Sequence, residues 1–216
     1  MRKIFLLCSV FLLLAAAASA DTIGNEVIDR YYLDGATNIA FIDPTLEFTT
    51  AGTLTSWSIW FKGYDPTTDP APELALQIYR PTASDTDWQL VHNDSIAFTT
   101  AASAGVYNLP STGFGDIQAG DVIGWWFGDT GGLIPYDNIG TDDVEWTHWT
   151  GSSSTPIYTP EIGTVYSFDT SSWANSSQHR EYSIAANYSP VPEPATILLL
   201  GFGMVGLAGL RKKFWS

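Results

Sequence analysis

The sequence predicts an all-β protein, built as a single two-sheet β-sandwich of jelly-roll-like type. Between residues 21 and 188 apolar and polar residues alternate in short runs, which is the pattern of half-buried strands. Gly, Pro, Asp, Asn and Ser separate these runs, and no long amphipathic helix is present to connect parallel strands. Eight or more short strands at this spacing favour two packed antiparallel sheets.

The individual strands follow from the same alternation. In 53–61 the residues Trp57, Ile59 and Phe61 share one face, and Trp60 lies on the opposite, otherwise polar face. In 73–80 every second residue is apolar, and in 122–127 a polar turn leads into an apolar run. We expect strands at 53–61, 73–80, 88–92, 96–100, 122–127, 144–149, 164–168 and 182–188.

The two ends of the chain are set apart from the predicted sandwich domain, 21–189. Residues 1–20 combine a basic start, an apolar run and a small-residue cleavage site, as in a secretory signal peptide. The single cysteine, Cys8, lies within this segment, so the sandwich has no disulfide and depends on packing. Residues 190–216 contain a Pro-rich stretch, an apolar run at 195–210 expected to form a transmembrane helix, and the basic tail Arg211, Lys212 and Lys213.

The C-terminal segment resembles the PEP-CTERM sorting signal of Gram-negative bacteria that make exopolysaccharide. The resemblance rests on Val191-Pro192-Glu193-Pro194-Ala195-Thr196, followed by the hydrophobic run and the basic tail. It implies that a membrane-embedded exosortase recognises Pro192, Glu193 and Pro194 and cleaves the tail. The domain would then pass from transient inner-membrane anchoring to the cell surface or the extracellular matrix. A simple tail anchor is the alternative interpretation.

Charge limits the partners of the domain. Residues 21–193 contain 23 acidic residues and only four basic ones, Arg30, Lys62, Arg80 and Arg180. Nucleic acid and anionic lipid require a basic surface, so neither is expected as a partner. Neutral glycans and divalent cations are compatible with this acidity.

Tryptophans in the second half of the chain suggest a glycan-binding surface. Trp125, Trp126 and Trp149 are the candidates, because flat aromatic faces stack on sugars. Adjacent strand residues face opposite ways, so one of Trp125 and Trp126 is exposed if one face of the sheet is solvated. If loops cover both faces, both tryptophans belong to the core.

The acidic stretch 129–145 suggests a calcium site, with Asp137, Asp142 and Asp143 as candidate ligands. The spacing does not match an EF-hand, and solvated loop charge is the alternative. Isolated histidines and the absence of a G-x-S-x-G motif give no support for a metalloenzyme or a serine hydrolase. We therefore expect a non-catalytic protein whose single candidate cofactor is calcium.

Three functional hypotheses remain open from the sequence. The first is an exported surface or matrix protein that binds exopolysaccharide without cleaving it. The second is a glycan-cleaving enzyme on a sandwich scaffold, which needs two carboxylates facing each other. The third is a purely structural, acidic matrix protein bridged by calcium.

Overall fold

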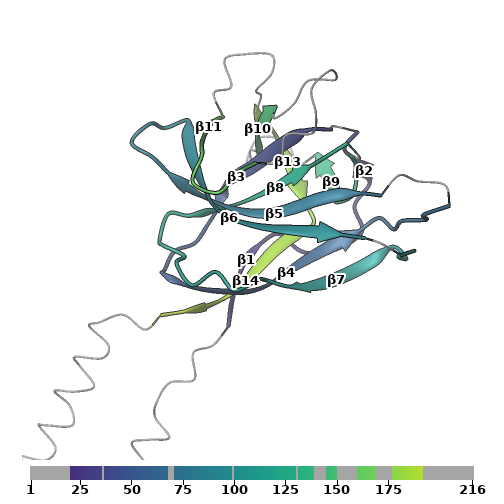
Figure 1. Cartoon of the computed structure of the whole chain (residues 1–216), viewed down its shortest axis with the longest axis horizontal. Coiled ribbons are helices and arrows are strands. Elements are labelled where there is room, and N and C mark those ends of the chain that lie inside the picture. Colours follow the sequence, from purple (N-terminus) through teal and green to yellow (C-terminus); the bar gives the residue numbers. More distant parts are fainter. Residues whose placement is uncertain are drawn as a thin grey trace, which may run out of the picture. The chain divides into compact units, whose positions relative to one another are not determined.

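The computed structural model describes residues 20–35, 37–67, 71–98, 100–129, 131–138, 145–149, 160–168 and 177–191 (Figure 1). All regular secondary structure in these segments is β, which confirms the all-β prediction. The strands belong to one of two units into which the chain divides, Ala20–Ser189. No helix in the described segments is long and apolar enough to span a membrane. The signal peptide, the helix expected at 195–210 and the basic tail lie outside the described residues.

Two sheets lie over one another and form the predicted sandwich (Figure 1). The four-stranded sheet has the order β1-β14-β4-β7, with strands Asp21–Gly24 (β1), Ile184–Pro190 (β14), Gly52–Phe61 (β4) and Gly105–Pro110 (β7). The seven-stranded sheet has the order β11-β6-β5-β8-β3-β10-β12, with strands Val165–Ser167 (β11), Asp87–Ala97 (β6), Glu73–Pro81 (β5), Val122–Phe127 (β8), Ile39–Glu47 (β3), Glu145–Trp149 (β10) and Ser177–Gln178 (β12).

A third, small sheet was not predicted. It has the order β13-β9-β2, with strands Arg180–Tyr182 (β13), Pro135–Asn138 (β9) and Tyr32–Leu33 (β2). Because β13 directly precedes β14, this sheet adjoins the four-stranded sheet along the chain.

The order of strands shows how the chain builds two layers. It passes from β3 in the seven-stranded sheet to β4 in the four-stranded sheet, returns for β5 and β6, crosses again to β7, and returns for β8. Strand β8 lies between β5 and β3 and is antiparallel to both. The alternation along a strand therefore determines which face of its sheet each side chain occupies. The crossings between the two sheets determine which sheet contains each strand.

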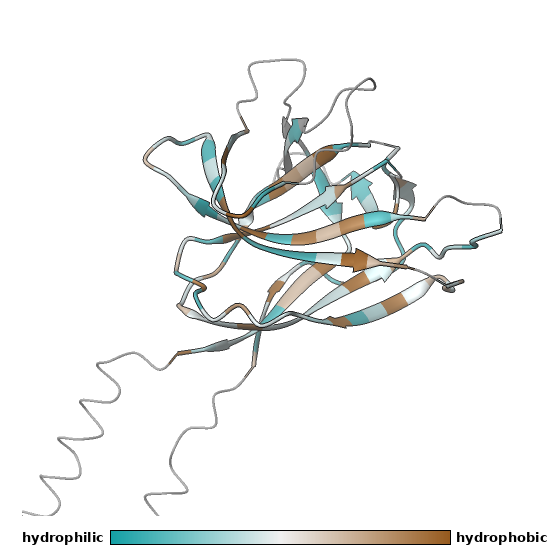
Figure 2. Cartoon of the chain, in the orientation of Figure 1, coloured by the Kyte–Doolittle hydropathy of each residue, from teal (hydrophilic) through white to brown (hydrophobic). Residues whose placement is uncertain are grey.

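Apolar side chains form two clusters, one on each face of the seven-stranded sheet. The first cluster lies between the two main sheets and includes Phe41 and Trp125 together with Trp57 and Tyr188 of the four-stranded sheet. The second cluster covers the outer face of the seven-stranded sheet and includes Ala40, Ile42, Ala75, Tyr79, Trp126, Tyr166 and Phe168. In contrast, side chains along β7 alternate between half-buried and exposed, as expected for a strand with one solvated face, and Figure 2 shows both hydrophobic and hydrophilic residues on this strand.

Five of the eight strand predictions agree closely with the structure: those at 53–61, 73–80, 122–127, 144–149 and 164–168 correspond to β4, β5, β8, β10 and β11. The strand expected at 182–188 corresponds to the end of β13 and most of β14. Residues 88–92 and 96–97, expected in separate strands, lie on one continuous strand, β6, that ends at Ala97. Strand β3 was not predicted, although it is central to the seven-stranded sheet.

Candidate functional site

The expected exposed tryptophan at 125–126 is not found, because loops and strands cover both faces of β8. Trp125 is 1 % exposed and belongs to the inner cluster, stacked on Phe41 with ring centroids 5.3 Å apart. Trp126 is 3 % exposed and belongs to the outer cluster. The two side chains do point in opposite directions, as the alternation requires, but both are in cores. The alternative interpretation, that both tryptophans belong to the core, is correct for this pair.

Several other sequence candidates lie wholly or partly outside the described residues. Trp149 is in β10, but its side chain is not described. The structure does not describe Asp142 and Asp143. It also does not describe the basic tail or the motif residues Pro192, Glu193 and Pro194. Asp137, in β9, accepts hydrogen bonds from the Tyr31 backbone N–H at 3.0 Å and from Arg30 Nη1 at 3.3 Å. Within the described segments no three His, Asp or Glu side chains are grouped so that they could hold a metal ion.

Trp60 is the tryptophan that the structure leaves accessible. Of the five tryptophans whose side chains are described, it alone is not buried. It lies in β4, opposite Val106 of β7, and Val106 is 52 % exposed. Its neighbours in β4, Ile59 and Phe61, point inward and are completely buried, so the indole of Trp60 is directed to the outer face of the four-stranded sheet.

A row of neutral polar side chains crosses all four strands on this outer face, and we call Thr22, Asn187, Ser58 and Asn108 the polar row. Thr22 Oγ1 donates a hydrogen bond to Asn187 Oδ1 at 2.8 Å. Asn187 Nδ2 donates to Ser58 Oγ at 3.2 Å, and Ser58 Oγ donates to Asn108 Oδ1 at 2.8 Å. In the described part of the chain Asn108 Nδ2 has no hydrogen-bond partner, so it is able to donate to a ligand.

The outer face therefore combines an aromatic surface with uncharged donors and acceptors. Trp60 follows Ser58 by two residues on β4, so both side chains are on the same face. Neighbouring strands are about 4.8 Å apart, which spaces the hydroxyl and amide groups at intervals close to the length of one sugar residue. The arrangement offers stacking and hydrogen bonding, but it contains neither a carboxylate nor a nucleophile.

A buried Asp94 links the two sheets in the core near β6. Its Oδ2 accepts hydrogen bonds from Trp57 Nε1 at 2.8 Å and from Ser111 Oγ at 2.7 Å. Its Oδ1 accepts from the backbone N–H of Thr112 at 3.0 Å and from its Oγ1 at 2.7 Å. His92 Nε2 is 2.7 Å from Oδ2. Asp94 thus ties β6 to β4 and to the loop that follows β7.

Ser111, His92 and Asp94 do not have the arrangement of a catalytic triad. In a triad the histidine separates the serine from the aspartate and removes the serine proton. Here Ser111 Oγ donates directly to Asp94, and the His92 nitrogen that is 3.3 Å from Ser111 is the same atom that contacts Asp94. The serine proton is bound to a carboxylate, so this cluster is an internal polar link and not a nucleophile with its base.

The pKa of Asp94 reflects these contacts. Burial alone would raise the pKa of the carboxyl above its usual value of 3.8. The hydrogen bonds that the carboxylate accepts outweigh burial and hold the pKa well below that value, with contributions in decreasing order from His92, Thr112, Trp57 and Ser111. Asp94 is therefore ionised throughout the physiological range.

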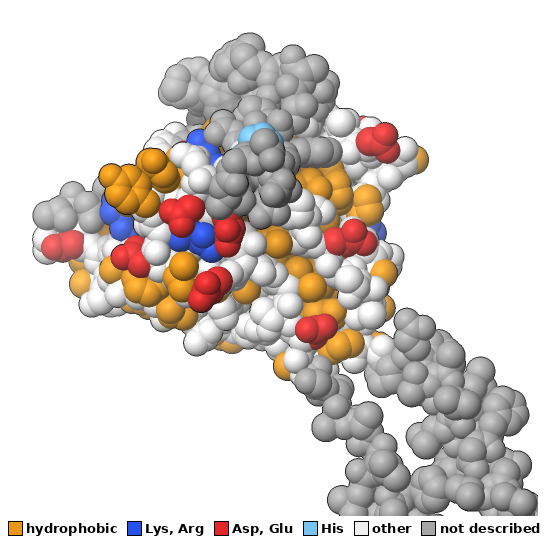
Figure 3. Space-filling model, turned by 180° about the vertical axis from the view of Figure 1, so that it is seen from behind, with side chains coloured by type: hydrophobic (Ala, Val, Ile, Leu, Met, Phe, Trp, Pro, Cys, Tyr) orange, Lys and Arg blue, Asp and Glu red, His pale blue; other side chains and the backbone are white. Residues whose placement is uncertain are grey.

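A second exposed aromatic group was missed from the sequence. Tyr31 is 84 % exposed and Tyr32 is 42 % exposed, and their rings are in edge contact with centroids 4.8 Å apart. The preceding residue, Arg30, is buried and forms ion pairs with Asp137 and Glu181. On the face in Figure 3, basic side chains are surrounded by acidic ones, and hydrophobic side chains lie beside them. Two adjacent tyrosines, the second of which begins β2, were the available signal in the sequence.

The comparison with known families concerns the C-terminal segment and not the β-sandwich. Residues 190–213 match the family model described as the PEP-CTERM protein-sorting motif. This match confirms the resemblance found in the sequence, and it identifies the chain as an exported substrate of exosortase that is held at the membrane before processing. No curated protein and no solved structure shows significant similarity to the chain.

Proposed function

We propose that this protein is a non-catalytic component of the cell surface or extracellular matrix, and that the outer face of its four-stranded sheet binds a neutral exopolysaccharide. The observation that carries the proposal is the pairing of the one accessible described tryptophan, Trp60, with the uncharged polar row beside it. Sorting by exosortase brings the domain to the compartment where such a polymer accumulates.

The chemistry of this face suits a sugar chain. The indole of Trp60 presents apolar area to the C–H surface of a sugar ring, and Trp adds contact area at low conformational entropy cost. Polar-row side chains exchange hydrogen bonds with sugar hydroxyls, and Asn108 Nδ2 is available as a donor. Since the whole chain has a net charge of −14, an anionic polymer would be repelled, which favours a neutral one.

The same face supports binding without cleavage. Glycoside hydrolysis commonly uses two carboxyl groups on opposite sides of the scissile bond, about 5 to 9.5 Å apart. The polar row has no carboxyl group. The buried carboxylate of Asp94 already makes five close polar contacts within the protein. We therefore assign no catalytic role to these residues.

The proposal is tested by equilibrium binding of the full-length chain, purified in detergent, to exopolysaccharide from the producing cells, with and without calcium. We expect saturable, calcium-independent binding that is weakened about tenfold or more in Trp60→Ala. Tyr31→Ala is the matched control, because it removes an exposed aromatic side chain from a different surface. Unchanged melting temperatures show that both variants are folded.

Three results would overturn the proposal or a part of it. If Trp60→Ala binds like the wild type while Tyr31→Ala loses binding, the polysaccharide site lies at the tyrosine pair. If the wild type does not bind the polymer under either condition, the face is not a polysaccharide site. Release of shortened or reducing sugar products from the polymer would show that the non-catalytic assignment is incorrect.

A further inference from the structure

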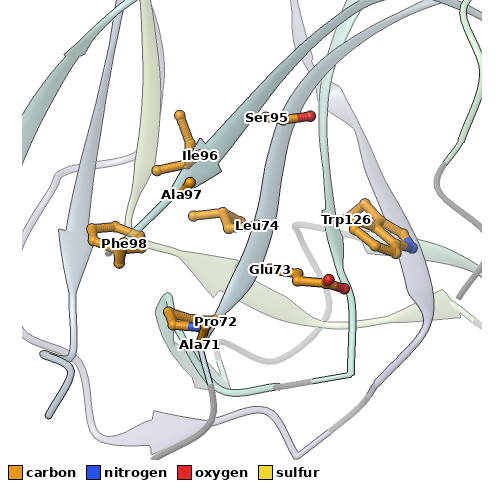
Figure 4. A pocket seen from close by; sticks show the side chains of 9 residues that line it. All are labelled: Ala71, Pro72, Glu73, Leu74, Ser95, Ile96, Ala97, Phe98 and Trp126. Atoms are coloured by element: carbon orange, nitrogen blue, oxygen red, sulfur yellow. The ribbon is translucent and has the colours of Figure 1, made fainter. Parts of the chain in front are cut away.

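A pocket of about 340 Å³ lies where β5 begins and β6 ends (Figure 4). Residues 71–74 and 95–98 line it together with Trp126. The walls are mostly apolar, with Phe98 and Ile96 on one side and Trp126 on the other, and Glu73 lies between them (Figure 4). A volume of this size is in the range of sites for small molecules rather than for single ions or waters.

Glu73 gives this apolar pocket a carboxylate that no cationic side chain of the described segments neutralises. Its Oε2 is buried and has no hydrogen-bond partner among the described residues. None of the ion pairs within the described segments involves Glu73. A carboxylate oxygen that is removed from water without a donor is costly, and a ligand that supplies a donor or a positive charge recovers part of that cost.

The backbone holds Glu73 in this position. Gly128 N–H donates to the Glu73 carbonyl at 2.9 Å, and Glu73 is paired with Ala97 of β6. A Cβ atom at position 128 would lie 2.2 Å from Glu73 Oε2 and 2.5 Å from Glu73 Cβ, so the side chain occupies space that only a glycine leaves open. The same hypothetical atom would lie 3.0 Å from the Trp126 ring, which places the carboxylate beside the indole.

We propose that this pocket binds a small organic ammonium ion, with the ammonium group at Glu73 beside Trp126 and a compact apolar body against the apolar lining. The carboxylate supplies the counter-charge, and the indole of Trp126 attracts a cation and covers the attached carbon atoms. Ser95, which also lines the pocket, supplies a hydroxyl for a second polar group of the ligand. This site is independent of the proposed polysaccharide face.

An ammonium group of this kind has two natural sources, a simple amine or an amino sugar, and four probes distinguish them. Cyclohexylammonium and cyclohexanol share a ring but differ in charge, and glucosamine and glucose differ in the same way. Binding to the full-length chain in detergent is measured by titration calorimetry, and by the intrinsic fluorescence that Trp126 contributes. We expect each ammonium probe to bind more tightly than its neutral counterpart by about tenfold or more.

Variants locate the site. Glu73→Gln should reduce the preference for the ammonium probes by about tenfold, whereas the exposed Glu47→Gln should leave it unchanged. Ala97→Phe, at an exposed position in the pocket wall, should block binding while Glu73 remains, which covers the case that Glu73→Gln does not fold. Tighter binding of cyclohexylammonium than of glucosamine indicates a simple amine, and the reverse indicates an amino sugar.

Three outcomes would overturn the proposal. They are equal binding of charged and neutral probes, ammonium binding that survives both Glu73→Gln and Ala97→Phe, and no saturable binding of any of the four probes. None of these results bears on Trp60, so failure of this site and failure of the polysaccharide face are separate findings.

Discussion

Asp94 shows how one residue joins secondary structure elements that are distant in sequence. It is 3 % exposed in the middle of β6, where a charged side chain would be strongly unfavourable without partners. Trp57 of β4, together with Ser111 and Thr112 beyond β7, supplies those partners. The carboxylate therefore fixes the indole of Trp57 in the core and attaches the loop after β7 to the seven-stranded sheet.

We predict that Asp94→Asn lowers the free energy of unfolding at pH 7 by about 2 kcal/mol or more, since it replaces charge-assisted hydrogen bonds with weaker ones. The pKa of Asp94 in the folded protein lies well below the usual value of 3.8. Its contribution to the free energy of unfolding is therefore complete above pH 3.8 and is lost as the pH falls from 3.8 toward the lower, native pKa. The stability difference between wild type and variant should thus narrow below about pH 4. Urea unfolding at several pH values measures this, with the exposed Asp85→Asn as control. A difference that stays constant with pH would contradict the prediction.

Gly124 in β8 allows close packing at the centre of the seven-stranded sheet. A Cβ atom at this position would lie 2.6 Å from the carbonyl oxygen of Phe41 and 2.6 Å from Cε2 of Tyr79. We predict that Gly124→Ala destabilises the fold by about 2–3 kcal/mol, because neither neighbour has room to move in a close-packed core. Gly35, with nothing within 4 Å of its hypothetical Cβ, provides the matched Gly35→Ala control, expected to change stability by less than about 0.5 kcal/mol. Equal denaturation midpoints for the two variants would contradict this explanation.

At the scale of the strands, the alternation of apolar and polar residues predicts some strands, whereas strands with polar residues or proline in their middle were divided or missed. Strands β4, β5 and β8 were predictable because their apolar residues recur with the period of a strand. Strand β6 was expected in two pieces because Asn93-Asp94-Ser95, between the two expected strands, has the composition of a turn, whereas tertiary contacts bury Asp94. Strand β3 was missed because Pro44 interrupts it, and the register is irregular between Asp43 and Glu47.

The sequence predicted the faces of the tryptophans on their strands, but it did not identify Trp60 as a candidate binding residue. The alternation placed Trp60 on a polar face, and the structure leaves it accessible there. For Trp125 and Trp126 the alternation gave opposite faces correctly, but the cover on the outer face comes in part from Tyr166 and Phe168, about 40 residues later. Glu73 was not recognised as a site residue, because its pocket requires Trp126 and Gly128 from another strand and its following turn.

The small sheet β13-β9-β2 depends on Arg30. Its guanidinium contacts Asp137 of β9, Glu181 of β13 and Ser183 Oγ, the last at 2.8 Å from Nε. We predict that Arg30→Ala destabilises the protein by about 1–3 kcal/mol, since it removes charge-assisted hydrogen bonds to two partly exposed carboxylates and the bond to Ser183. Arg30→Lys should restore only part of this lost stability, because an ammonium group cannot reach all of these acceptors at once.

Hydrogen exchange of the β9 and β13 amides tests this role, because local opening of the small sheet should become easier in both Arg30 variants. The core amides of β5 and β8 should be protected as in the wild type in Arg30→Lys. A loss of protection spread equally over all strands would mean that Arg30 supports the whole sandwich rather than the small sheet. Wild-type protection of β9 and β13 in Arg30→Ala would contradict the role altogether.

At the scale of the whole molecule, delivery and binding are assigned to different parts of the chain. The match to the sorting motif spans 190–213, whereas the proposed polysaccharide face is made by β1, β14, β4 and β7.

We predict that replacing Pro192, Glu193 and Pro194 by alanine leaves an unprocessed precursor in the membrane fraction, while its affinity for the polysaccharide in detergent equals that of the wild type. Trp60→Ala should behave in the opposite way, with normal processing and weakened binding. Cell fractionation, intact-mass measurement and the binding assay are applied to both variants. If the motif variant also loses binding, or if Trp60→Ala is not processed, then sorting and binding are coupled and the division of labour between the two units is incorrect.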